Sequence, residues 1–591
     1  MTEDTMRWEL SRLYPSTDSA EFDADLDAAQ RRAASFAADY RGRVAALDAA
    51  AMATALERYE TLAEAAAKPQ HYAYLLFSSD SASDRHREIY QRAAEAENRT
   101  SQELMFFELE LMETPEADFV RLCADPALER YRHFLKGVRR FRPHTLSEKE
   151  EKLLKLKSLT GTEAFTSLYD EVSASFRFRF ELEGETREMS GEELLALLHH
   201  ADAGVRERAF SLFLERHGEN EAVYRSVFNT AILDHAQDLE LRSFSHPMQP
   251  TNLANEIEDE VVERIMDVSE ANYAMAREYF ALKSRLLGME KLKNSDLYAP
   301  IPGADRRYTF AEAKQAVLEA MESFSPRFRE IAEGFFSGGR LDVLPRTGKS
   351  GGAFCMPITP RIPPFVLLNF TGDIRDVSTM AHELGHGIHF VLAQRQSMLN
   401  YGPPLTLAET ASTFCEMVLA SALERKESDL TARRSLLCAQ IEDIIATTFR
   451  QNVLTRFEAR IHLERKNGLL SSQALCDIWL EENAKLYGDA VEMIPPYRWG
   501  WTYISHFIHS RFYCYSYVFA ELLVLSLFSK YRKEGSAFVP VFEEILASGG
   551  SRTPGDTLRP AGIDPARPEF WQEGYDLLGE LIGELKEIMP E

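Results

Sequence analysis

The spacing of apolar and polar positions predicts helices over most of the chain. Residues 19–113 are rich in Ala, Glu and Arg, and their apolar residues recur every three to four positions, which is the helical period. Gly42 and Pro69 are the only strong helix breakers in this stretch, so we expect long antiparallel helices. After a break at residues 142–147, the pair Ser147 and Glu150 predicts a capped helix start.

Two short regions depart from the helical pattern. Residues 175–189 alternate apolar and charged side chains around Glu183 and Gly184, which predicts a β-hairpin. Residues 340–364 are rich in Gly and Pro, and the apolar run at 365–370 predicts a short buried strand. We therefore predict a mostly α fold with a small β element.

The strongest chemical signal is the pentapeptide His382-Glu383-Leu384-Gly385-His386. On a helix, residues four apart lie about 40° apart around the axis and about 6 Å apart along it. Both imidazoles can therefore reach one zinc ion. Glu383 flanks the same side of the helix, where its carboxylate can act as a general base without being a ligand. Asp376 and Ser378 are the candidate N-caps of this helix.

A catalytic zinc usually takes three protein ligands, often two His and one Glu. A second predicted helix begins near Leu405 and carries Glu409 in its first turn and Glu416 two turns later. Both carboxylates lie on one face of an otherwise apolar helix, so each needs a partner. The spacing leaves both open as the third ligand. We prefer Glu409 as the ligand and Glu416 as a carboxylate that supports one.

The segment 382–389, followed by 408–412, resembles the oligoendopeptidase F branch of the thimet oligopeptidase family. The resemblance extends to residues 363–372, which look like the family's lead-in strand, and to 350–355, which look like its glycine-rich substrate-side segment. In that family the Glu of the second motif is the third zinc ligand, which corresponds to Glu409 here.

The resemblance implies a large helical metallopeptidase that encloses a deep substrate channel. We expect residues 1–190 to form a helical region that covers one wall, and residues 191–591 to form the zinc-binding catalytic region. Gly351 and Gly352 would leave the backbone open for a peptide to lie alongside as an added strand.

His506, Tyr513 and Tyr517 are separated by seven and four residues, so a continuous helix would carry them on one face. Tyr503 would lie at the edge of that face and Tyr515 would point away. An aromatic stripe in the core explains this spacing by itself. The resemblance implies instead that His506 and one of the two tyrosines donate hydrogen bonds to the substrate, and it leaves open which tyrosine does so.

The net charge and the cysteine content limit which binding partners and which cellular compartment we expect. The net charge of −26 disfavours nucleic acid, which requires a basic surface. The acidic N-terminus lacks the apolar core of a secretory signal, and no apolar stretch is long enough to span a bilayer. Six scattered cysteines without a CxxC pair are typical of free thiols in a reducing cytoplasm.

We therefore predict a cytoplasmic endopeptidase with one zinc ion per chain that cleaves internal bonds of short unstructured oligopeptides. Two alternatives remain. A helical zinc carboxypeptidase would need a basic residue to hold the substrate terminus, for which Arg498 and Arg511 are candidates. A non-catalytic scaffold with a structural metal, or none, would have no use for Glu383. The sequence does not indicate the oligomeric state.

Overall fold

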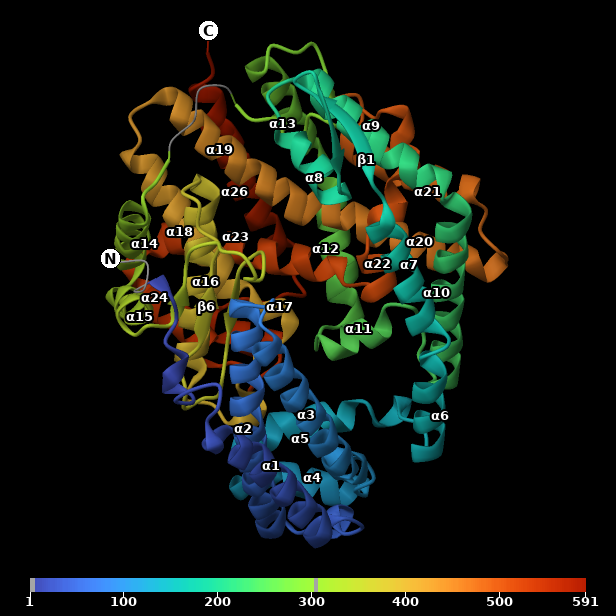
Figure 1. Cartoon of the computed structure of the whole chain (residues 1–591), viewed down its shortest axis with the longest axis vertical. Coiled ribbons are helices and arrows are strands. Elements are labelled where there is room, and N and C mark those ends of the chain that lie inside the picture. The colour runs from blue at the N-terminus through green and yellow to red at the C-terminus, as the bar shows by residue number, and fades with distance from the viewer. Residues whose placement is uncertain (1–5, 302–306, 591) are drawn as a thin grey trace. The chain divides into compact units, whose positions relative to one another are not determined.

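The structure is a computed structural model that describes residues 6–301 and 307–590 (Figure 1). Helices dominate both of its compact units and the strands are short, which confirms the predicted mostly α fold. The first unit comprises Met1–Arg142, Arg306–Leu423 and Lys530–Ile563, and the second comprises Pro143–Asp305, Glu424–Ser529 and Asp564–Glu591. The boundaries of these compact units differ from the functional division that we expect at residue 190. That functional division stays a prediction.

The first unit begins with a set of long helices. These are α1 (Ala20–Tyr40), α2 (Ala49–Ser79) and α3 (Asp84–Met112), which pack pairwise, followed by α4 (Glu116–Ala124) and α5 (Arg132–Arg140). Of the two predicted breakers, Gly42 lies between α1 and α2 with a φ of 76°. Pro69 lies inside α2 and does not end it, because the packing of α2 against α1 and α3 offsets the hydrogen bond that proline cannot make.

The remainder of the first unit surrounds one helix, α16. Its elements are α14 (Phe310–Phe324), α15 (Pro326–Ser337), β4 (Leu341–Asp342), β5 (Phe354–Met356), β6 (Phe365–Leu367), α16 (Ile374–Ala393), α17 (Leu405–Ala408), α18 (Thr410–Lys426), α24 (Val539–Ala547) and α25 (Pro554–Leu558). The rings of Phe324, Phe414 and Phe542 pack together, with centroids 4.8 Å apart for the first pair and 4.1 Å for the second. This aromatic contact fixes α18 against α14 and α24.

A three-stranded sheet packs beside α16, as the sequence predicts. Its order is β4-β6-β5, with β6 parallel to β4 and antiparallel to β5. The central strand β6 is fully buried, which explains its continuous apolar run. Both β5 and β6 contact α16, so the sheet supports the helix that carries the pentapeptide.

The second unit is helical apart from two strand pairs. Its elements are α6 (Glu148–Ser158), α7 (Thr162–Ser175), β1 (Phe178–Leu182), β2 (Glu185–Met189), α8 (Gly191–Ala196), α9 (Ala203–Glu219), α10 (Glu221–Leu241), α11 (Gln249–Ala254), α12 (Asp259–Ala271), α13 (Tyr273–Leu286), β3 (Leu292–Lys293), α19 (Leu430–Ile445), α20 (Gln451–Glu464), α21 (Ser472–Tyr487), β7 (Val491–Glu492), α22 (His506–His509), α23 (Cys514–Glu534) and α26 (Pro568–Glu587). Trp479, Trp501 and Trp571 are fully buried and anchor its core.

Two local predictions in this unit are confirmed. β1 and β2 form an antiparallel hairpin in which Leu182 pairs with Glu185. The two turn residues, Glu183 and Gly184, both have positive φ, of 53° and 81°, which suits the twist of a two-residue hairpin turn. Ser147 and Glu150 form the predicted capping box at the start of α6.

In the part of the chain that the structure describes, no single helix is long and apolar enough to span a membrane. The segments Pro495–His509 and Cys514–Ala537 reach that length and composition only when taken together, and they bend by 85° at the break between them. Most of the apolar residues of α23 are buried in the protein.

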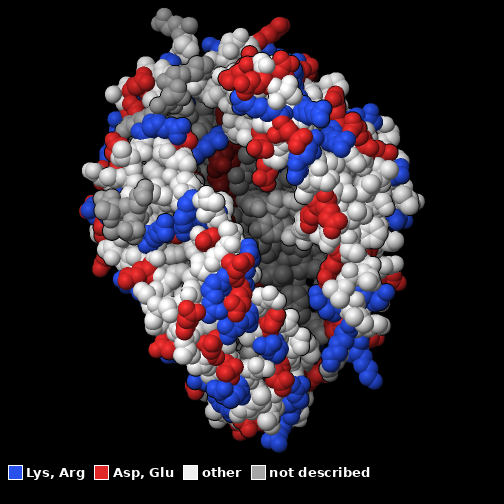
Figure 2. Space-filling model, in the orientation of Figure 1, with Lys and Arg blue, Asp and Glu red and all other residues white. Residues whose placement is uncertain are grey.

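The surface charge is mixed rather than segregated. Figure 2 shows acidic and basic side chains interspersed over the face in view, without a continuous basic stripe. The expectation that nucleic acid is not a partner, drawn from the net charge of −26, stays a prediction.

Candidate metal centre

Helix α16 presents the pentapeptide, and its start is fixed by a different cap from the one predicted. Asp373, rather than Asp376 or Ser378, occupies the N-cap position. The carboxylate of Asp376 accepts hydrogen bonds from the backbone N–H groups of Thr371 at 2.6 Å and Gly372 at 2.9 Å. These bonds satisfy donors of the turn that joins β6 to α16 and so fix the register in which the helix begins.

The structure brings together the three residues predicted as ligands. The Nε2 atoms of His382 and His386 lie 3.1 Å apart, and Oε2 of Glu409 lies 3.3 Å from the first and 3.2 Å from the second. A tetrahedral zinc with bonds of about 2.0–2.2 Å holds its ligand atoms about 3.3–3.6 Å apart. The donor set and its separations therefore fit a zinc ion.

Glu409 reaches this position because the second helix is interrupted. The chain forms the short helix α17 and then α18, with Glu409 at the joint between them. The hydroxyl of Ser412, in the first turn of α18, donates to Oε2 of Glu409 at 2.8 Å. The carboxylate is thus held by its own helix while it faces the two imidazoles.

Glu416 contacts the opposite side of His382. The Nδ1–H of His382 donates to Oε1 of Glu416 at 2.5 Å, and the hydroxyl of Ser378 donates to Oε2 at 2.8 Å. Burial lowers the pKa of His382, but Glu409 and Glu416 outweigh it and raise the pKa to about 11. A carboxylate on Nδ1 fixes the tautomer and the ring orientation, which is the usual arrangement behind a metal-ligating His.

Glu383 is buried beside these groups, and its side chain is only 6% exposed. Its Oε2 has no hydrogen-bond partner among the described residues. Burial raises the pKa of this carboxyl group, and the two imidazoles oppose that shift. Cys355 of β5 is nearby, and burial followed by the Glu383 charge raises the pKa of its thiol. All six cysteines are free.

The glycine-rich segment lies on the surface at the start of β5. Gly351 and Gly352 are exposed, and Gly352 has a φ of 71°. The side chain of Asn369 donates to the carbonyl oxygens of Ser350 at 2.9 Å and Gly352 at 2.8 Å. The loop is therefore held in one conformation, and β5 forms one edge of its sheet.

His506, Tyr513 and Tyr517 lie together in the second unit, but not on one continuous helix. His506 begins the short helix α22, and α23 begins only at Cys514. The prediction of a single helical face is therefore wrong. The chain turns at Phe512, which has a φ of 55° and whose N–H donates to Glu458 at 2.9 Å. This contact lies 54 residues away in the sequence, so the spacing did not reveal it.

The turn nevertheless brings the three rings into contact. His506 Nε2 and the Tyr517 hydroxyl are 3.3 Å apart, and the His506 and Tyr513 rings stack at 5.7 Å. Tyr515 points away, as predicted, and its hydroxyl accepts a hydrogen bond from Asn255 at 2.8 Å. Tyr503 instead accepts a hydrogen bond from Arg450 at 3.2 Å.

A model of peptidase family M3 matches residues 196–577, and a model described as Oligopeptidase F matches residues 110–178. The chain belongs to peptidase family M3. This membership identifies it as a metalloendopeptidase and confirms the resemblance noted from the motifs.

Relatives and solved structures match over most of the chain. Oligopeptidase PepF of Bacillus subtilis is 23% identical over 99% of this chain and 87% of its own length. Group B oligopeptidase PepB of Streptococcus agalactiae is 25% identical over 88% of this chain and 87% of its own length. A peptidase structure from Chlamydophila abortus superposes with a TM-score of 0.89 at 22% identity, covering 100% of this chain and 99% of that one. Oligoendopeptidase F from Enterococcus faecium gives 0.71 at 23% identity, covering 97% and 99%.

Two glycines allow close packing around this site, and the motifs did not single them out. A Cβ atom at Gly385 would lie 2.6 Å from the Cα of Ser412, and one at Gly387 would lie 2.5 Å from the ring of Phe335. Gly385 therefore lets α16 approach the first turn of α18 closely enough for His386 to face Glu409. The sequence signal for this packing role was a glycine between the two His residues of the pentapeptide.

Proposed function

We propose that this M3 peptidase is a zinc-dependent endopeptidase that uses His382, His386 and Glu409 as ligands of one metal ion per chain. The observation that carries the proposal is the set of three ligand-atom separations, 3.1, 3.2 and 3.3 Å. They lie within about 0.2 Å of the spacing around one tetrahedral zinc, so only a small adjustment of the side chains is needed. Glu416 supports the site by holding Nδ1 of His382.

When bound, zinc supplies a Lewis acid that polarises the scissile carbonyl and lowers the pKa of water. Glu383 is the general base in this proposal. Its buried carboxylate has an oxygen without a partner in the described residues, and it is free to accept a proton from the attacking water. It then passes that proton to the leaving amine as the peptide bond breaks.

We assign the stabilisation of the developing oxyanion to His506 together with Tyr513 or Tyr517. Mutual contact of the three side chains supports a shared role, and the M3 resemblance supports this particular one. The imidazole and the phenol are hydrogen-bond donors of the kind that stabilise such a charge. The alternative explanation, an aromatic stripe packed in the core, is weaker because these three residues do not share one helix face.

The substrates in this proposal are short unstructured peptides. A peptide would lie in extended form along the edge strand β5, beside Gly351 and Gly352, where no side chain obstructs its backbone. No Cβ contact within 4 Å would arise at either glycine, so the approach from outside is open. We place the reaction in the cytoplasm, because the six cysteines are all free.

The carboxypeptidase alternative assigns the recognition of a free C-terminus to Arg498 or Arg511. Arg498 donates to Gln473 at 2.7 Å. Arg511 is largely buried and has two side-chain nitrogens without a partner in the described chain. The names of the relatives favour internal cleavage, since several are called oligoendopeptidase F.

One assay tests the proposal against this alternative. The purified chain is analysed for zinc and incubated with an internally quenched peptide whose two ends are blocked. We expect about one zinc per chain and cleavage of the blocked peptide at an internal bond, abolished by chelation and restored by zinc. Cleavage of a free-ended peptide only, one residue at a time from its C-terminus, would establish the carboxypeptidase instead.

A further inference from the structure

The second unit contains a cavity of about 220 Å³, and none of the residues assigned to the peptidase site lines it. Its polar lining consists of Arg450, His199, Asn294 and four tyrosines, which are Tyr298, Tyr487, Tyr497 and Tyr503. Its apolar wall includes Leu195, Leu198 and Phe210. Among the described residues, no acidic side chain lines it, so the described lining combines one arginine, several hydroxyl groups and an apolar surface.

Arg450 has no carboxylate partner among the residues that the structure describes. Its Nη2 donates to the hydroxyl of Tyr503 at 3.2 Å, and no carboxylate of the described residues lies within 4.0 Å of its guanidinium group. An arginine stays protonated under all ordinary conditions. A neutral hydroxyl satisfies one of its five N–H donors but does not offset its charge.

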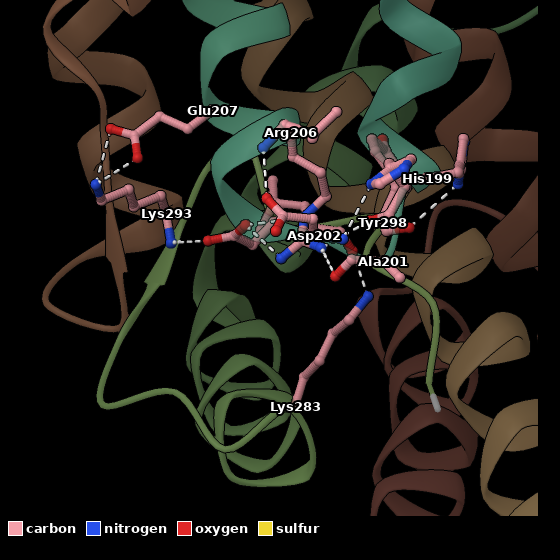
Figure 3. Close-up of polar contacts among 12 residues, drawn as sticks. His199, Ala201, Asp202, Arg206, Glu207, Lys283, Lys293 and Tyr298 are labelled. Atoms are coloured by element: carbon pink, nitrogen blue, oxygen red, sulfur yellow. Dashed lines mark hydrogen bonds and ion pairs between the residues drawn. The ribbon is translucent and has the colours of Figure 1, made fainter. Parts of the chain in front are cut away.

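Three other cations of the same unit, unlike Arg450, are each paired with a carboxylate. Figure 3 shows one such pair, Lys293 with Glu207. The pairs are Arg206 with Asp296 at 2.8 Å, Lys283 with Glu442 at 2.5 Å and Lys293 with Glu207 at 2.8 Å. In the part of the chain that the structure describes, these three cations have carboxylate partners, whereas Arg450, which lines the cavity, has none.

The backbone that presents Arg450 is also unusual. Residues Ala446–Arg450 form a π-helical segment between α19 and α20. Segments of this kind are rare, and they occur often at functional sites because the wider turn redirects one side chain. Arg450 is the last residue of the segment, and its side chain lines the cavity.

We propose that this cavity binds a small organic molecule that has one carboxylate and an apolar body. The guanidinium group presents a planar fork of donors that matches a carboxylate, and the tyrosine hydroxyls flank it. The leucines and Phe210 bury the apolar part of the ligand. An ammonium group finds no acidic partner in the lining, so a free amino acid is disfavoured. A free carboxylic acid and the C-terminal residue of an N-acylated peptide share the required chemistry.

The test measures binding of three probes to the full-length chain by titration calorimetry. The probes are 3-phenylpropionate, N-acetylphenylalanine and the uncharged 3-phenylpropionamide. We expect at least one carboxylate to bind with 1:1 stoichiometry and at least tenfold more tightly than the amide. Tighter binding of 3-phenylpropionate points to a free acid as the ligand, and tighter binding of N-acetylphenylalanine points to a peptide end. Equal binding of the amide, or no binding of either acid, overturns the proposal.

Two variants separate this cavity from the metal centre, where a carboxylate could also bind. Arg450→Met should weaken binding of the carboxylate at least tenfold, while the control Arg264→Met, which changes an exposed arginine of α12, should not. If Arg450→Met does not fold, Leu198→Trp provides the same test, because it fills the cavity without changing its charge. Undiminished binding in the folded cavity variant would place the ligand elsewhere and overturn the proposal.

Discussion

At the scale of single residues, the two carboxylates of α18 differ in which nitrogen of His382 they face. Glu409 lies 3.3 Å from Nε2, whereas Glu416 accepts a hydrogen bond from Nδ1 at 2.5 Å. The sequence could not separate these roles, because both glutamates fit one helix face. The interruption of the helix at Glu409 is a tertiary feature, and it turns this carboxylate toward both imidazoles.

This difference predicts that substitutions of Glu409 and Glu416 reduce zinc binding to different extents. Glu409→Ala should strip most of the zinc, because it removes a ligand. Glu416→Gln should weaken zinc binding about 10–100-fold, because it loosens a supporting contact. Zinc content after dialysis against a chelator of graded strength measures both. Full retention of zinc by Glu409→Ala together with its loss in Glu416→Gln would exchange the two assignments.

A second prediction at this scale concerns Glu458, which holds the turn at Phe512 through one oxygen. Burial raises the pKa of Glu458 to about 8, and the Phe512 N–H and Arg511 oppose the shift. The raised pKa means that folding takes up a proton between the unfolded value of 4.5 and about 8. The resulting stabilisation is complete below pH 4.5 and is lost as the pH rises toward 8.

Glu458→Gln keeps an acceptor for Phe512 but does not titrate. Its free energy of unfolding should therefore fall less between pH 5 and pH 8 than that of the natural chain, by up to about 1.4 kcal/mol per pH unit. Urea unfolding at several pH values gives this difference. Because His235 and His462 stand beside the same cluster in both proteins, their titration cancels. Parallel pH profiles would show that Glu458 is ionised in the folded state.

At the scale of elements, the site depends on how closely α16 approaches α18. The spacing within the pentapeptide predicted that the imidazoles of His382 and His386 lie side by side, as they do, because that information is local to one helix. It did not predict the approach of the second helix, which depends on Gly385 against Ser412. The break between α22 and α23 escaped prediction for the same reason, since Glu458 lies far away in the sequence.

Gly385→Ala should therefore damage the metal centre without touching a ligand. The added methyl group would lie 2.6 Å from the Cα of Ser412, so the helices must move apart. We expect a loss of stability of about 1–3 kcal/mol and weaker zinc binding. The matched control is Gly334→Ala in α15, where no atom lies within 4 Å of the new methyl group. It should be neutral or stabilising by up to about 1 kcal/mol, and equal effects of the two changes would refute the close-approach argument.

At the scale of the whole molecule, the sequence predicted the helical character but not the division into two compact units. Periodic apolar positions report the type of element, but each compact unit is assembled from three separate stretches of the chain. The cavity around Arg450 illustrates the difficulty. Its lining comes from segments between Leu195 and Tyr503, and no motif joins them. The separate roles of residues 1–190 and 191–591 stay a prediction.

The expected substrate class gives a prediction at this scale. A peptide that adds to β5 must be extended, and a folded protein would first have to unfold at a cost of about 5–15 kcal/mol. We expect cleavage of a short blocked peptide and none of a stable folded protein that carries the same sequence in an exposed loop. Mass spectrometry of both digests makes the comparison. Comparable cutting of the two would mean that access is not restricted to unstructured chains.

The central claim is that a buried carboxylate drives hydrolysis at a three-residue zinc site, and Glu383→Gln tests it most directly. The amide has the same shape but cannot accept a proton. The measurement pairs zinc content with the turnover number on an internally quenched peptide. The account predicts an unchanged content of about one zinc per chain and a turnover number reduced by at least about 100-fold. Substantial turnover with the metal in place would contradict the role of Glu383.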